Sequence, residues 1–384
     1  MPTQPNAESL SIAVVAHIRH AIAEPFQGGM ESHASMLCKG LRRRGHSVTL
    51  FAAGGSDDPC LVPLCDRPYQ DILPWDLYRG SFELAEYQRH AFSCARSEIR
   101  AGGFDVVHNN SLYPDLIGWL REDGVPCVTS HHVPPFAAIR DATVKASDAQ
   151  HAQFTVTSQD QKRIWSEAGV PSMQVVHNGI DIDFWRPGDQ SGEHLCWAGR
   201  INPNKGVEDA ILAARMANVP LRLFGPVDDA PYFVDRIEPL LNAEIQFFGA
   251  VSRERLRDEM ASASAVLVTP KWDEPFGLVA AEAMACGTPV LAYDRGALRE
   301  VVGPGGIVVP DDHSSLARAI ATRASVDRDL CRMRAVTHFS VEAMLSGYEE
   351  LYATAMVGRG LTVAPSAAAF ADASSCSSTT VLLA

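Results

Sequence analysis

The chain of 384 residues lacks several features that would assign it to a protein class directly. It contains no apolar run near the ~18 residues that span a membrane, and its first residues lack the basic-then-apolar order of a signal peptide. Its nine cysteines form no C-x-x-C pair and suggest neither a zinc site nor a disulfide framework. We therefore expect a soluble, cytoplasmic protein with reduced cysteines.

An excess of positive charge is also missing. The formal net charge is −13, so nothing favours binding to nucleic acid or stable association with anionic membranes. The length suits two domains, and 46% hydrophobic residues suffice to give each a core. Residues 1–9 and the small, polar tail 359–384 are predicted to be disordered.

Strand and helix patterns alternate along the chain. Ser11–Ala16 is a nearly unbroken apolar run, Met30–Arg44 repeats apolar residues at helical spacing, and Ser47–Ala52 is strand-like. The order restarts with His194–Ala198 and Val207–Ala217. The sequence therefore predicts an α/β fold with two Rossmann-like, doubly wound parallel-sheet domains, at residues 10–187 and 188–340.

The two strand-to-helix loops carry the first candidate site residues. G-x-G-x-x-G, the usual dinucleotide fingerprint, is absent, but Gly28 and Gly29 stand together before the first helix. They form either a tight turn or a backbone surface that a diphosphate can approach. In the second domain, Arg200 and Lys205 flank a short turn at a helix start. Isolated surface cations are usually only solvated, but two at the ligand edge of a sheet could neutralise phosphate.

Residues 272–290 (WDEPFGLVAAEAMACGTPV) contain two carboxylates, Glu274 and Glu282, around the predicted start of a helix. Phe276-Gly277-Leu278-Val279 forms the turn into that helix, whose free amides can bind phosphate. A glutamate early in a helix often serves only the helix dipole. Together, however, these residues could hold a sugar hydroxyl, a phosphate and a ribose.

Three histidines follow predicted strands at the productive edge of the first sheet. We interpret His108 as a structural hydrogen-bonding residue, whereas the strand-end sequence SHHVPP makes His132 a candidate sugar contact. No metal-ligand cluster is visible in the sequence, so we expect no bound metal.

The stretches EPFGLVAAEAMACGTPV and GRINPNKG closely resemble the signatures of retaining glycosyltransferases of family 4. These enzymes have the GT-B fold, in which two Rossmann-like domains face a cleft. The resemblance covers about residues 10–357 and implies that a last helix, about 341–357, returns to the first domain. The long first loop and W-x-EPFG most resemble a bacterial subgroup labelled pterin glucosyltransferases.

The resemblance also implies residue roles. Gly28 and Gly29 would touch the donor diphosphate, and Arg200 and Lys205 would clamp it. The segment His177–Asp181 resembles the end of the family's first domain, but from its residues alone we interpret it as a sharp turn with Gly179 at positive φ. The remaining expected donor contacts are Gly225 and Val251 at the base, Glu282 at the ribose, Glu274 and His132 at the sugar, and Phe276, Gly277, Leu278 and Val279 at the phosphate. We predict His132, Glu274, Arg200 and Lys205 as the catalytic set.

The predicted function is retaining, metal-independent hexosyl transfer without a cofactor. The donor would be a nucleotide-diphosphate sugar, with uridine and glucose preferred, and the acceptor a soluble hydroxyl compound that the sequence does not identify. A lipid acceptor is disfavoured because the first half shows no basic amphipathic face. Two alternatives are a nucleotide-sugar epimerase on the same fold and a non-catalytic nucleotide-sugar sensor.

Overall fold

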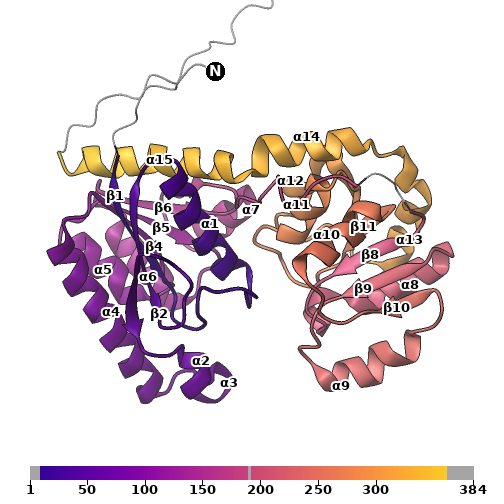
Figure 1. The fold of residues 1–384 in the computed structure, drawn as a ribbon, viewed down its shortest axis with the longest axis horizontal. Coiled ribbons are helices and arrows are strands. Elements are labelled where there is room, and N and C mark those ends of the chain that lie inside the picture. Colours follow the sequence, from indigo (N-terminus) through magenta and orange to yellow (C-terminus); the bar gives the residue numbers. More distant parts are fainter. Residues whose placement is uncertain (1–8, 189–191, 361–384) are drawn as a thin grey trace, which may run out of the picture.

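The structure, a computed structural model, describes residues 9–188 and 192–360. Its strands form two separate parallel sheets, one of seven strands and one of six. Figure 1 shows the two domains side by side, with helices around each sheet and the long helix α15 lying along the first domain. The arrangement confirms the predicted fold of two Rossmann-like domains.

The first sheet is built around β1, whose residues Ile12 to Val15 are fully buried because helices cover both faces of the sheet. In register, Val14 lies opposite Leu50 on one side and His108 on the other. The sheet order is β3-β2-β1-β4-β5-β6-β7, so the winding reverses between β1 and β4. The strands are β1 (Ser11–Ala16), β2 (Ser47–Ala53), β3 (Leu61–Cys65), β4 (Val106–Asn110), β5 (Cys127–His131), β6 (Ala152–Val156) and β7 (Gln174–Val175).

Amphipathic helices cover this sheet. In α1 the buried residues Ala34, Leu37, Cys38 and Leu41 recur at helical spacing and pack against β1 and β2. The helices of this domain are α1 (Gly29–Arg43), α2 (Tyr69–Ile72), α3 (Trp75–Tyr78), α4 (Phe82–Gly102), α5 (Pro114–Glu122), α6 (Ala137–Ala146) and α7 (Gln159–Glu167).

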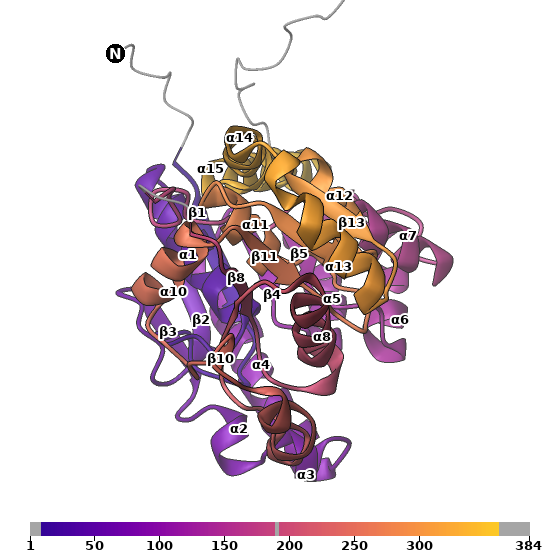
Figure 2. The same cartoon turned by 90° about the vertical axis from the view of Figure 1, so that its right-hand side faces the viewer.

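The second sheet has the order β10-β9-β8-β11-β12-β13 and repeats the reversal between β8 and β11. Alternate residues of β8 enter different cores: Leu195 and Trp197 pack on the side of α8 and α13, and Cys196 on the side of α11 and α14. Figure 2 shows α8 and α13 next to each other on one side of the strands, away from α10 and α11.

The elements of the second domain follow in chain order. The strands are β8 (Leu195–Ala198), β9 (Leu221–Phe224), β10 (Ile245–Phe247), β11 (Ala265–Val268), β12 (Val290–Tyr293) and β13 (Gly306–Val309). The helices are α8 (Val207–Ala217), α9 (Ala230–Tyr232), α10 (Arg253–Ser262), α11 (Leu278–Ala285), α12 (Leu298–Val302), α13 (His313–Thr322) and α14 (Arg328–Phe339).

Two chain segments cross between the domains next to each other. The Ile180 amide donates to Phe339 O (2.7 Å), and the Val341 amide donates to Ile180 O (3.1 Å). From there α15 (Val341–Gly358) returns to the first domain, where its buried Tyr348 and Tyr352 join the core beside β1.

The prediction that Gly179 sits at positive φ is wrong. Gly179 is absent from the positive-φ glycines of the described residues. A Cβ there would instead lie 2.8 Å from the Cα of Val341, so this glycine lets α15 approach closely.

Two predictions touch residues that the structure does not describe. The predicted disorder at the ends falls almost entirely on residues 1–8 and 361–384, outside the described residues. The domain boundary at 187/188 lies beside residues 189–191, also outside them, and stays a prediction. Within residues 9–188 and 192–360, every helix is too short or too polar to span a bilayer.

Candidate active site

A cavity of about 360 Å³ lies between the two domains, at the edge where the carboxyl ends of the strands meet. The first domain and the crossing segment supply one wall, and the β8–α8 and β11–α11 loops supply the other. Nine of the predicted site residues line the cavity: Gly29, His132, Arg200, Lys205, Glu274, Phe276, Gly277, Leu278 and Val279.

The loop after β8 holds the two predicted cations. It forms a short 3₁₀ turn, Pro203–Lys205, and then reaches Gly206 at φ 63°. A Cβ on Gly206 would lie 1.9 Å from Thr269 O, so only glycine lets this loop pack against the neighbouring one. The Arg200 side chain is 57% exposed and forms only a long ion pair with Asp228 (3.9 Å), so much of its guanidinium group remains accessible to an anion.

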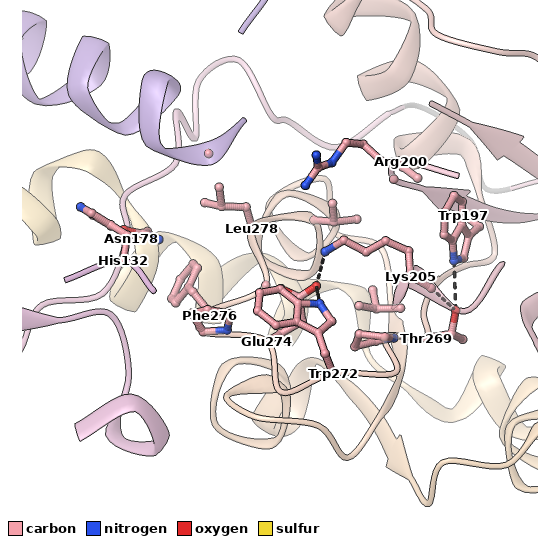
Figure 3. Close-up of a pocket in the computed structure, with 18 of the residues that line it drawn as sticks. His132, Asn178, Trp197, Arg200, Lys205, Thr269, Trp272, Glu274, Phe276 and Leu278 are labelled. Carbon is pink, nitrogen blue, oxygen red and sulfur yellow. Dashed lines mark hydrogen bonds and ion pairs between the residues drawn. The ribbon is translucent and has the colours of Figure 1, made fainter. Parts of the chain in front are cut away.

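Lys205 forms an ion pair with Glu274 across the two loops of the second domain, as Figure 3 shows. The indole Nε1 of Trp272 donates to the same Glu274 oxygen (3.1 Å), and the ammonium of Lys205 lies 5.4 Å from the centre of that indole ring. The Glu274 side chain is only 12% exposed. Its carboxylate is therefore held in one place at the cavity wall.

The N-terminus of α11 lines the cavity next to the Lys205–Glu274 ion pair. Gly277 is its N-cap at φ 92°, and a Cβ there would lie 2.6 Å from Leu298 Cδ2. The side chain of Phe276 is buried edge-on against Phe339 (5.4 Å), which anchors the turn. The first amides of the helix, those of Leu278 and Val279, belong to residues that line the cavity. An anion is stabilised at such a helix start.

Glu282 lies one turn further along α11 and is absent from the residues that line the cavity. The two glutamates were predicted to face the same site, but of the two only Glu274 lines the cavity. Glu282 is half-buried, and the structure shows no ion pair or hydrogen bond for its carboxylate within the described residues. Burial raises the pKa of Glu282 to about 7, although the positive charge of Arg253 opposes the change.

Gly29 of the first domain faces α11 across the cavity. A Cβ added to Gly29 would lie 2.7 Å from Leu278 Cδ1, so the missing side chain lets the two domains approach. Gly28 is the N-cap of α1 and does not line the cavity. A Cβ there would lie 3.2 Å from an oxygen of Glu31, whose carboxylate folds back over the helix start.

His132 lines the cavity, whereas the histidine before it points into the core. The Nε2 atom of His132 lies 3.0 Å from Asn110 Oδ1, and its ring packs edge-on against His33 (4.4 Å). Burial, helped by the charge of His17, lowers the pKa of His132 to about 4. His132 is therefore uncharged at neutral pH and suits hydrogen bonding rather than charge neutralisation.

The other histidines have structural partners. His131 is buried and stacks on Trp165 (4.1 Å). His108 is fully buried between Tyr352 OH (2.6 Å) and Ser130 Oγ (3.0 Å). The structural interpretation of His108 is confirmed.

Gly225 and Val251 lie behind the cavity wall. A Cβ on Gly225, at φ 136°, would lie 1.9 Å from the oxygen of cavity residue Gly199. Val251 is partly buried in the core beside α11. Their predicted contact with the base stays a prediction.

Sequence reasoning missed several cavity residues. Asn178 was interpreted as part of a turn, but it lines the cavity and its Oδ1 atom has no hydrogen-bond partner within the described residues. Trp197 donates through Nε1 to Thr269 Oγ1 (3.1 Å), and Thr269 Oγ1 donates to Gly206 O (2.9 Å). Asn178 could have been found from the sequence, because it is a polar residue directly before Gly179 in the segment that joins the domains.

No group of three or more histidine, cysteine, aspartate or glutamate side chains within the described part of the chain could hold a metal ion. Metal independence of the reaction stays a prediction.

Comparison with known families decides the assignment. The model of "Glycosyl transferases group 1" matches residues 185–332, and that of "Glycosyltransferase Family 4" matches residues 27–184. The chain belongs to glycosyltransferase family 4. The two matches fall on the two domains described above, so the glycosyltransferase has the GT-B organisation over most of its length.

Individual relatives agree with this assignment. D-inositol 3-phosphate glycosyltransferases of a Nocardioides species and of Mycobacterium leprae are each 29% identical to this glycosyltransferase. The alignments cover 84% of this chain and 82% of the first relative, and 72% and 74% for the second.

Solved structures show the same fold. AviGT4, a glycosyltransferase of avilamycin A biosynthesis, has a TM-score of 0.68 at 25% identity, covering 91% of this chain and 98% of its own. Anabaena HepE in complex with UDP has a TM-score of 0.69 at 18% identity, covering 89% and 98%. None of these relatives is described as a pterin glucosyltransferase, so that subgroup stays a prediction.

Proposed function

We propose that this glycosyltransferase transfers a hexose from a nucleotide-diphosphate sugar to a hydroxyl acceptor, with retention of configuration and without a metal ion. One observation carries the proposal: Arg200, Lys205 and the N-terminus of α11 converge on a single cavity between the domains. These three positive features fit two linked phosphates.

The chemistry follows from where charge develops. As the bond between sugar and phosphate breaks, negative charge grows on the departing diphosphate. Lys205 and Arg200 would stabilise this charge, which is the task that a metal ion performs in other transferases. Glu274 keeps Lys205 in place through their ion pair, and it would accept hydrogen bonds from the donor sugar.

Other residues would position the donor. Glu282 would accept hydrogen bonds from the ribose, and Gly225 and Val251 would border the base. His132 is uncharged and would contact the sugar near its reacting carbon. With a pKa of about 4 it would be a weak base, so the donor phosphate itself is the proposed acceptor of the proton from the attacking hydroxyl.

For the donor we propose UDP-glucose, as the sequence resemblance suggests. HepE, which has a similar fold, has been solved with UDP and with UDP-glucose, which supports this choice of donor. For the acceptor we propose a polar, soluble hydroxyl compound, and the inositol phosphate in the names of the relatives supports that class. A cytoplasmic location stays a prediction of the sequence.

A panel of nucleotide sugars tests the proposal. Each would be incubated with the protein, first alone and then with candidate acceptors, and followed by mass spectrometry and NMR. Glucosyl transfer from UDP-glucose with an α-configured product is expected. Conversion of the donor sugar without acceptor would indicate an epimerase, and tight binding without any turnover would indicate a sensor.

A further inference from the structure

Two hydroxyl groups of the first domain bind a backbone carbonyl of the second domain. Thr157 and Ser158 follow β6, and their side chains donate to the oxygen of Pro275 at 2.9 and 2.8 Å. Both residues are buried, with exposed fractions of 2% and 0%. Buried hydrogen bonds of this kind have no competing water, so no water replaces a lost donor, and the carbonyl is then held by the other hydroxyl alone.

The carbonyl that they bind belongs to the loop that carries Glu274 and Phe276. From within the second domain, the Ala297 amide donates to Glu274 O (2.9 Å). The peptide groups on either side of Pro275 are therefore held from two different domains. The Glu274 side chain, which contacts Lys205 and Trp272, extends from this doubly anchored segment.

Further hydrogen bonds hold the two domains together near Pro275. The carboxylate of Glu300 on α12 accepts from the Gln159 amide (2.8 Å) and lies 2.7 Å from His177 Nε2. The first turn of α7 thus rests on the second domain beside Pro275. The hydroxyl groups of Thr157 and Ser158 can reach Pro275 O only while the start of α7 is docked on the second domain.

We propose that Thr157 and Ser158 are positioning residues, which fix the loop bearing Glu274 only when the two domains are docked. Domain docking is thereby coupled to completion of the transfer site. This inference rests on the proposed function, because it assigns the two hydroxyls to the same reaction. Neither hydroxyl needs to touch the substrate.

Thr157 offers the cleaner test, because Ser158 also caps α7 by accepting from the Gln161 amide (3.1 Å). Thr157→Val removes the donor at nearly constant volume, and Thr157→Ser keeps it. With UDP-glucose and a working acceptor, Thr157→Val is expected to lower kcat about tenfold, since misplaced catalytic groups lose rate steeply. Thr157→Ser should retain most of the rate, and UDP affinity by calorimetry should change less than about twofold, because the second domain holds the nucleotide.

A double-mutant cycle separates positioning from general weakening of the fold. If Thr157 acts through Glu274, Thr157→Val should slow the Glu274→Gln enzyme by far less than it slows the unmodified enzyme. Ser81→Ala is the matched stability control, because Ser81 only caps α4 (3.2 Å to the Leu84 amide). It should lower the melting temperature without lowering kcat.

The outcomes are distinct. If the unmodified protein transfers sugar and Thr157→Val has the same kcat, the positioning role is overturned and the proposed function is left intact. Equal losses in both Glu274 backgrounds would also overturn it. Absence of any transfer by the unmodified protein would instead overturn the proposed function on which the inference rests.

Discussion

The ionisation of Glu282 should make the stability of the protein depend on pH. Its carboxylate is half-buried in α11, and the structure shows no cation paired with it within the described residues. Burial raises its pKa from 4.5 to about 7. An unpaired carboxylate in such a place costs folding free energy whenever it is ionised.

The sign and the size of the effect on the free energy of unfolding follow from how many protons Glu282 binds in the folded and unfolded states. Between pH 4.5 and 7 the folded protein holds a proton on Glu282 that the unfolded chain has lost, so stability falls as pH rises through this range. At about 1.4 kcal/mol for each pH unit, the total cannot exceed about 3.5 kcal/mol. Above pH 7 this penalty is complete and constant.

Glu282→Gln removes the ionisable group and should therefore stabilise the empty protein in a pH-dependent way. Urea unfolding at pH 8 should give a free energy of unfolding up to about 3.5 kcal/mol above that of the unmodified protein, and a much smaller difference at pH 5. Glu350→Gln, on an exposed position of α15, should change neither value. An equal effect of Glu282→Gln at both pH values would refute the reasoning.

Three further predictions concern the donor. UDP-glucose binding should weaken about tenfold for each pH unit below 7, because binding selects the ionised Glu282, and calorimetry on Glu282→Gln should show no such dependence. Lys205→Ala should slow transfer about a hundred- to a thousandfold, as removal of one donor to developing charge does, and an unchanged kcat would exclude this role. Gly29→Ala places a methyl group 2.7 Å from the present position of Leu278 Cδ1, so Leu278 must move within the cavity and the rate of transfer should fall, and a second change, Leu278→Ala, should recover part of it.

Much of the fold follows from local patterns. Ser11–Ala16 and Val207–Ala217 were predicted with the bounds that the structure shows, because a buried strand and an apolar helix each have a clear period. The edge strand β13 (Gly306–Val309) was missed because Gly303-Pro304-Gly305-Gly306 predicts a turn. Helix α14 was missed because its buried residues are few among many charged ones.

The site was predictable where one loop carries the chemistry, as with Phe276 to Val279. Relations between distant segments were not. Lys205 and Glu274 form an ion pair although they are 69 residues apart. The correct reason for Gly179 required the position of α15, and the bonds from Thr157 and Ser158 to Pro275 required the docking of two domains.

A crystal structure of the protein with UDP-glucose would test the central claim most directly. We expect the diphosphate to lie between Gly29 and the start of α11, within hydrogen-bonding distance of Lys205 and Arg200, with the ribose at Glu282. A nucleotide bound outside this cavity, or a diphosphate that contacts neither Lys205 nor Arg200, would contradict it.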